Sequence, residues 1–191
     1  MSASPPAGSP ALQAYRTLRE FRSAEIVIKR SRFIGWGSPV ETEEAALELL
    51  NQIRAEHPQA THHCYAYRVG LGTETVRFSD DGEPAGTAGL PMLAVLRKQN
   101  LDQVLATVVR YFGGIKLGAG GLVRAYTETT AQALTGADKV PIISWQQLGC
   151  MLPYPLEGAV RRALETEPVR HVQLQYGESV RLHLEVDRDH A

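Results

Sequence analysis

The first half of the chain alternates between strand-like and helix-like patterns of apolar residues. Short β-branched or aromatic runs bounded by turns predict strands, and apolar residues three and four apart predict a helix. Thr42 is expected to cap that helix, because its side chain can accept a first-turn N–H group. Pro58 is expected to end it. The predicted strands of this half lie at residues 26–28, 33–36, 62–69 and 75–78.

The middle of the chain contains the longest apolar run. Residues 104–112 are almost continuously apolar, which predicts a strand buried on both faces. Before this run, Thr87 is a candidate cap for a helix over 90–98. After it, a glycine-rich loop at 113–121 leads into a second amphipathic helix, which Gly136 is expected to stop.

Composition suggests a tail and two domains. Residues 1–15 begin with a Ser/Pro/Ala/Gly-rich segment that is too poor in large apolar groups to fold, so a flexible tail is expected. Residues 138–141 resemble a linker between a domain at 16–137 and another at 140–191. The second domain is predicted to be β-α-β-β, the first two-thirds of a ferredoxin-like unit, and is therefore expected to be incomplete.

The overall charge excludes a protein-wide attraction to nucleic acid. Twenty Lys and Arg oppose 21 Asp and Glu, giving a net charge of −1, so any polyanion must bind a local patch. No segment has the sequence pattern of a membrane-spanning helix or of a secretion signal. Cys64 and Cys150 lie far apart without metal-ligand spacing, which favours a reduced, cytoplasmic setting. Neither a metal nor a cofactor is expected.

The glycine-rich loop is the sharpest candidate for chemistry. It follows a buried strand and opens a helix, whose first N–H groups and dipole favour an anion such as phosphate. The pattern is neither a Walker A motif nor GxGxxG. The alternative interpretation is a tightly packed strand-to-helix turn with an incidental lysine. The candidate anion- or RNA-binding residues are Arg110, Gly113, Gly114, Lys116, Gly118, Gly120, Gly121 and Arg124.

An acidic turn precedes the second predicted helix. Asp80, Asp81 and Glu83 lie within four residues and could hold Mg²⁺, although acids in such turns are more often solvated. The small residues that follow, including Gly86 and Thr87, suit close contact with a partner backbone or a phosphate. These five residues form a candidate contact surface, and no catalytic residue is assigned.

Four motifs resemble those of the bacterial YigZ branch of the IMPACT family. They occupy residues 31–34, 62–68, 79–91 and 110–126, and the similarity extends over about 16–137. The resemblance implies an α+β protein with an N-terminal domain like domain 2 of ribosomal protein S5. It also implies a small ferredoxin-like C-terminal domain resembling domain V of elongation factor G.

The resemblance favours a regulatory function. Both implied folds recur in proteins that work on ribosomes, RNA or GTPases, and eukaryotic relatives regulate translation by engaging an activator of an eIF2α-type stress kinase. The leading hypothesis is a cytoplasmic, non-enzymatic protein that contacts RNA, the ribosome or a translation factor. One alternative is a phosphate- or peptide-handling enzyme using the acidic turn and the loop. Another is a protein-binding adaptor using Gly86–Pro91. The sequence leaves the ligand and oligomeric state open.

Overall fold

The computed structural model describes residues 15–70, 75–143 and 145–187. The chain divides into two compact units, residues 1–142 and residues 143–191. Each unit has its own β-sheet structure and its own apolar core. Helices and antiparallel sheets occur in both, which confirms the α+β class.

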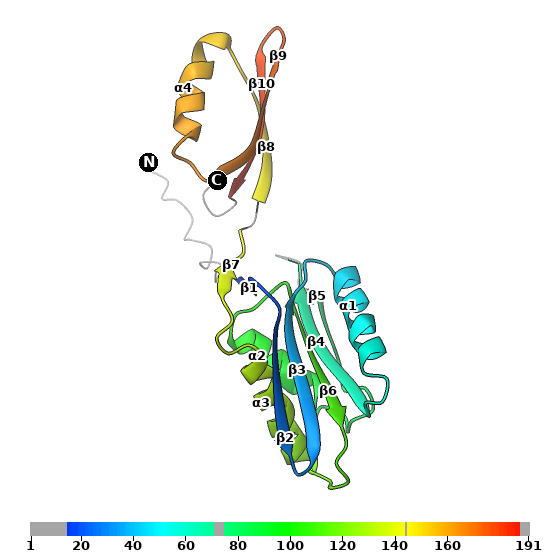
Figure 1. Ribbon diagram of the computed structural model, residues 1–191. Coiled ribbons are helices and arrows are strands. Elements are labelled where there is room, and N and C mark those ends of the chain that lie inside the picture. The colour runs from blue at the N-terminus through cyan, green and yellow to red at the C-terminus, as the bar shows by residue number, and fades with distance from the viewer. Residues whose placement is uncertain (1–14, 71–74, 144, 188–191) are drawn as a thin grey trace, which may run out of the picture. The chain divides into compact units, whose positions relative to one another are not determined.

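The first unit is built on a five-stranded antiparallel sheet with helices on both faces. Helices α2 and α3 cover one face, and α1 covers the other (Figure 1). The strands, in their spatial order, are β2 (Arg22–Ile28), β3 (Ser31–Pro39), β6 (Val104–Tyr111), β4 (His62–Val69) and β5 (Thr75–Ser79). The helices are α1 (Glu43–Glu56), α2 (Gly89–Lys98) and α3 (Ala119–Ala133).

Strand β6 lies at the centre of this sheet and is covered on both sides. Val104, Ala106 and Val108 join the core beneath α2 and α3, whereas Leu105 joins a smaller cluster beneath α1. Because both faces are buried, the strand is apolar at nearly every position, as the sequence predicted. Arg110 is the charged exception, and it follows the same alternation onto the α2 and α3 face.

The sequence predicted N-terminal capping residues for two helices, and the structure bears out one of them. Thr42 caps α1 as expected, accepting the N–H of Ala45 at 3.2 Å. The expectation for Thr87 is wrong. Its hydroxyl donates to the Pro84 carbonyl at 2.6 Å, and α2 begins only at Gly89.

The expected linker at 138–141 is also wrong. Residues Lys139–Pro141 form strand β7, which pairs antiparallel with β1 (Arg16–Leu18) and so belongs to the first unit. The expected tail lies outside the described residues, except for Tyr15. The Tyr15 carbonyl accepts the N–H of Ile142 at 2.9 Å, so this residue extends the pairing.

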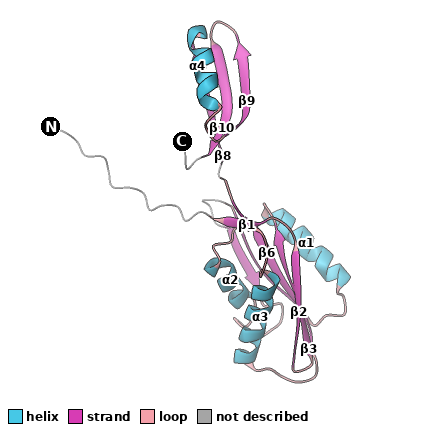
Figure 2. Cartoon of the chain, turned by 60° about the vertical axis from the view of Figure 1, so that its left-hand side comes forward, coloured by secondary structure: helices cyan, strands magenta, loops and turns pink. Residues whose placement is uncertain are grey.

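The second unit is a three-stranded antiparallel sheet with one helix on one face (Figure 2). The order β8-β10-β9 places the last strand between the other two. Helix α4 buries Leu152, Val180, Leu182 and Leu184. Its elements are β8 (Trp145–Leu152), α4 (Tyr154–Leu164), β9 (Val169–Tyr176) and β10 (Val180–Asp187). The predicted β-α-β-β order is confirmed. No helix among the described residues is long and apolar enough to cross a membrane.

Candidate functional site

A cavity of about 370 Å³ lies between the glycine-rich loop, the acidic turn and the end of the central strand. It brings together two motifs that the sequence presented separately, since Glu83 comes from the acidic turn and Lys116 and Gly118 from the loop. Its volume falls within the range of about 300–1,000 Å³ typical of small-ligand sites. It is lined by Thr61, His62, Glu83, Pro84, Arg110, Phe112, Lys116, Leu117, Gly118, Ala119 and Leu122.

Strand register positions the polar wall of the cavity. Phe33 on β3, Arg110 on β6 and His62 on β4 are direct cross-strand partners and form one row. Since the row points towards the helices, the Arg110 side chain lies beneath the acidic turn, and the whole residue is only 4% exposed. The register therefore converts a residue expected beside the loop into a buried group.

The buried charge of Arg110 is balanced by Glu83. Arg110 Nη1 donates to Glu83 Oε1 at 2.6 Å, and the Tyr126 hydroxyl donates to the same oxygen at 2.7 Å. The Glu83 side chain is 3% exposed. Arg110 Nη2 also donates to Ser31 Oγ at 3.2 Å. Arg110 is thus paired within the protein, which corrects the expectation that its full charge is available to an anion.

Two polar atoms of this network, one on Arg110 and one on Glu83, have no hydrogen-bond partner among the described residues. Arg110 Nε is shielded from solvent and has no hydrogen-bond partner. At Glu83, both donors reach Oε1, and no donor among the described residues reaches Oε2. Arg110 Nε is the solvent-shielded atom of this wall that lacks a partner, whereas Glu83 Oε2 is not among such atoms and can accept a hydrogen bond from a molecule in the cavity.

The glycines of the loop serve different purposes. A Cβ atom on Gly113 would lie 2.1 Å from the Arg30 carbonyl carbon, so this glycine allows the loop to pass against the β2–β3 turn. Gly118 has φ of +73° and open space around it, and it supplies no side chain to cap α3. Packing therefore explains Gly113, as the packed-turn interpretation requires, whereas Gly118 leaves the start of α3 open.

Positive charge gathers around the loop from more segments than expected. Lys116 is exposed and lines the cavity, and Arg124 is exposed on α3 but is not among the lining residues. The close approach of Gly113 to Arg30 also brings the exposed Lys29–Arg30 turn next to the loop. The local patch thus includes a basic turn that the sequence showed only as a connection between strands.

The acidic turn is a structural element rather than a solvated metal site. Asp80 accepts the N–H groups of Gly86, Ala88 and Gly89 at 2.8–2.9 Å and so caps α2 from outside the helix. Asp81 accepts the His63 N–H at 2.6 Å. With these carboxylates already occupied, no group of three His, Cys, Asp or Glu side chains in the described part of the chain is arranged to hold a metal ion.

We expect Asp80→Asn to lower the free energy of unfolding at neutral pH by about 1.5 kcal/mol, the lower end for hydrogen bonds to charged groups, because Asp80 is partly exposed. Partial burial acts to raise the pKa of Asp80, but the three backbone donors outweigh it and hold the pKa below its usual value.

A depressed pKa in the folded state stabilises the fold above the ordinary carboxyl pKa of about 3.9. This contribution is lost as the pH falls through the folded-state pKa. Urea unfolding between pH 7 and pH 2 should therefore show a gap between wild type and Asp80→Asn that closes in acid. A gap independent of pH would contradict this role of the carboxylate.

The structure does not support Cys64 as a catalytic nucleophile. It is fully buried, with Sγ 3.0 Å from the Asp80 carbonyl oxygen and 3.4 Å from the Tyr126 hydroxyl. Burial raises the pKa of this thiol far above its usual range, despite the hydrogen bond to Tyr126. Burial also raises the pKa of Tyr126. Both groups therefore remain protonated at neutral pH and serve the packing of the network.

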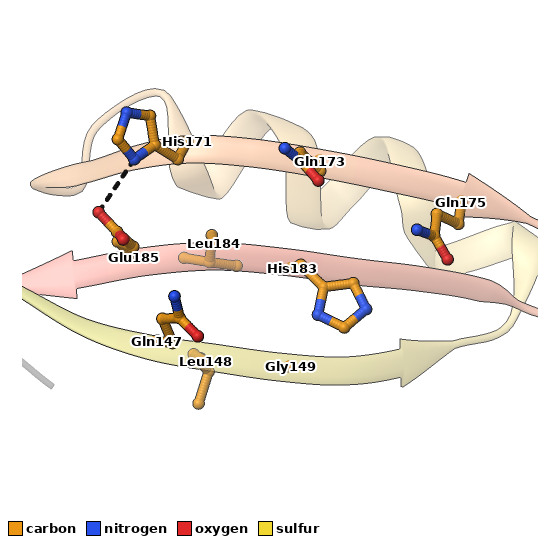
Figure 3. Close-up of a pocket in the computed structure, with 9 residues that line it drawn as sticks. All are labelled: Gln147, Leu148, Gly149, His171, Gln173, Gln175, His183, Leu184 and Glu185. Atoms are coloured by element: carbon orange, nitrogen blue, oxygen red, sulfur yellow. Dashed lines mark hydrogen bonds and ion pairs between the residues drawn. The ribbon is translucent and has the colours of Figure 1, made fainter.

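The second unit carries a larger but different hollow, of about 760 Å³, on the sheet face shown in Figure 3. Amide and imidazole side chains line it, including Gln147, Gln173 and His183. Its carboxylate, Glu185, is already paired with Arg170 Nε at 2.6 Å and His171 Nδ1 at 3.0 Å. Among the described residues, no side chain lining this face has a solvent-shielded polar atom without a partner, whereas Arg110 of the first unit has one, so the cavity beside the loop is the better candidate site.

Comparison with known proteins agrees with this placement of the motifs. The family model described as the Impact N-terminal domain matches residues 29–134, a segment that contains all the residues lining the cavity. The chain belongs to the IMPACT family. The resemblance noted in the sequence is thereby confirmed, and the cavity lies within the domain that defines the family.

Individual relatives extend the similarity beyond this domain. The IMPACT family member YvyE of Bacillus subtilis is 41% identical over 169 residues, covering 88% of this chain and 78% of that protein. The IMPACT family member YigZ of Escherichia coli is 48% identical over 123 residues, covering 62% and 60% respectively. A solved structure described as a hypothetical protein is 36% identical, with a TM-score of 0.67, and covers 90% of this chain and 84% of its own.

Sequence reasoning missed the cavity residues that lie outside the two motifs. His62 was noted only as a strand residue, yet its Nδ1 lies 2.8 Å from the Asp81 carbonyl oxygen, which identifies Nδ1 as the protonated nitrogen. Phe112 follows the central strand and is 47% exposed. No local sequence signal identified His62 as a cavity residue, because the pairing of β4 with β6 is what sets it beside Arg110.

Proposed function

We propose that this protein is a cytoplasmic, non-enzymatic regulator of translation that binds RNA at the glycine-rich loop. The observation that carries the proposal is the cavity, where exposed Lys116 meets the uncapped start of α3. Backbone N–H groups at a helix N-terminus and a nearby cation form a suitable environment for phosphate. Membership of the IMPACT family supports translation as the process in which such binding acts.

The surroundings of the cavity favour RNA over a small inorganic anion. The exposed cations Lys29, Arg30 and Arg124 lie on the segments around the loop, so successive phosphates of one strand can be neutralised. Exposed Phe112 adds an aromatic surface. Cations interleaved with aromatic groups are characteristic of proteins that bind single-stranded nucleic acid. The acidic protein as a whole does not attract RNA, so the binding is confined to this patch.

The two folds implied by the resemblance form part of the proposal. We infer that the first unit is related to domain 2 of ribosomal protein S5 and that the second is related to domain V of elongation factor G. The order β8-β10-β9 with one crossover helix supports the second relationship, because it matches the beginning of a ferredoxin-like unit. If these structural relationships hold, contact of this protein with a ribosomal component or a translation factor is expected.

The double variant Lys116→Ala/Arg124→Ala is expected to weaken binding of a single-stranded RNA oligonucleotide. Each lost phosphate contact reduces the slope of log affinity against log salt by about 0.7 for single strands, so a reduction of about 1.4 is expected. Fluorescence anisotropy with a labelled oligonucleotide between 50 and 200 mM salt measures this slope.

The matched control is Arg97→Ala/Lys98→Ala, which removes the same two charges from exposed positions on α2. It should leave both the affinity and the salt slope near those of wild type, because its positions lie outside the lining of the cavity. Equal effects of the two double variants, or no RNA binding by the wild-type chain, would refute the proposed function.

A further inference from the structure

The cavity contains an acceptor that an anion alone cannot satisfy. Glu83 lines the cavity with a side chain that is 3% exposed, and its Oε1 already accepts from Arg110 and Tyr126. Its Oε2 receives no hydrogen bond from the described residues. A phosphate would be repelled by this oxygen, so a ligand that fills the cavity must bring a hydrogen-bond donor to it.

Other parts of the lining require different chemistry. Lys116 and the first N–H groups of α3, which Gly118 leaves uncapped, suit a negatively charged group. Pro84, Phe112, Leu117 and Leu122 provide apolar and aromatic surface. The complementary ligand therefore combines a phosphate, a flat apolar ring and an N–H donor on that ring.

We infer that the cavity receives one unstacked nucleotide of an RNA strand. Its phosphate binds at Lys116 and the start of α3, its base packs against Phe112, and an exocyclic amino group of the base donates to Glu83 Oε2. Proteins that recognise single-stranded RNA commonly stack splayed bases on aromatic rings and read their polar edges. This inference rests on the proposed function and specifies the part of the RNA that enters the cavity.

The amino group makes the inference specific. Adenine, cytosine and guanine each carry an exocyclic amino group, whereas uracil does not, so a preference against uridine is expected. A hydrogen bond to a base edge that is made or lost changes affinity by about tenfold, from the 1–3 kcal/mol ascribed to good base contacts. His62, whose Nδ1 is held by the Asp81 carbonyl, also lines the cavity but is not needed for this discrimination.

Isothermal titration of the full chain with two nucleotides and inorganic phosphate tests the inference. AMP and purine riboside 5′-monophosphate differ only in the exocyclic amino group. AMP is expected to bind about tenfold more tightly than the analogue, and both should bind more tightly than inorganic phosphate. The comparison uses wild-type protein, so its outcome does not depend on whether a variant folds.

The variant Glu83→Gln tests the acceptor directly. Its amide oxygen can still accept from Arg110 and Tyr126, while its amino group replaces Oε2 and cannot accept. If the variant retains the thermal transition of a folded protein, the preference for AMP over the analogue should disappear.

Equal binding of AMP and the analogue by wild type, or binding of AMP no tighter than phosphate, would overturn the inference. So would an undiminished AMP preference in folded Glu83→Gln. If RNA binding nevertheless depends on Lys116 and Arg124, the proposed function stands without the nucleotide pocket. Loss of both results would remove both proposals.

Discussion

Replacing Glu83 with alanine is expected to lower the free energy of unfolding by about 3–5 kcal/mol, the typical effect of breaking a buried ion pair from one side. Arg110 is 4% exposed, and its bond to Glu83 Oε1 is 2.6 Å long. Removing the carboxylate leaves a largely buried guanidinium that has lost its counter-charge and cannot lose its proton. The Tyr126 hydroxyl loses its acceptor in the same step. Chemical denaturation followed by circular dichroism measures the change.

Two further variants separate this effect from the loss of any ion pair. Glu25→Ala removes the exposed pair with Arg32 and should leave the free energy of unfolding nearly unchanged. Glu83→Leu combined with Arg110→Met removes both buried charges and should be less destabilised than Glu83→Ala alone. Similar stability of Glu83→Ala and Glu25→Ala would show that the buried pair does not have this role.

The variant Gly113→Ala is expected to cost about 3 kcal/mol, the upper part of the range for overpacking. The added methyl group would lie 2.1 Å from the Arg30 carbonyl carbon and 2.2 Å from its oxygen. Both are backbone atoms, so the strain cannot be relieved by rotating a side chain. Either the loop or the β2–β3 turn must move. A fall in the midpoint of thermal unfolding reports this cost.

Gly120→Ala is the control within the same loop. A methyl group there would meet only the flexible Arg124 side chain, at 3.8 Å, and Gly120 lies in helix α3, where alanine is preferred by about 0.5–1 kcal/mol. This variant should therefore be as stable as wild type or more stable. Equal destabilisation by the two substitutions would mean that loop flexibility, rather than close packing at Gly113, determines stability.

Local patterns were sufficient for most elements of the fold. The central strand, the amphipathic stripe of α3 and the final hairpin were all predicted from apolar spacing, because a face that packs against a core must be apolar at the period of its element. The loop at 113–121 was also visible, since its glycine density exceeds that of an ordinary turn. The short strand within 138–141 was harder to predict from the sequence. This segment resembled a linker because the strand with which it pairs lies more than a hundred residues away.

The sequence by itself therefore determined the α+β class, the family motifs and the loop that opens α3. Only the tertiary structure decided how the charges are used. Asp80 rather than Thr87 caps α2, and Glu83 rather than a ligand neutralises Arg110. The reason is that cap and ion-pair partners are chosen by distance in space, which strand register sets and local spacing does not contain. The register of β4 against β6 is what places His62 beside Arg110 and forms one cavity from two distant motifs.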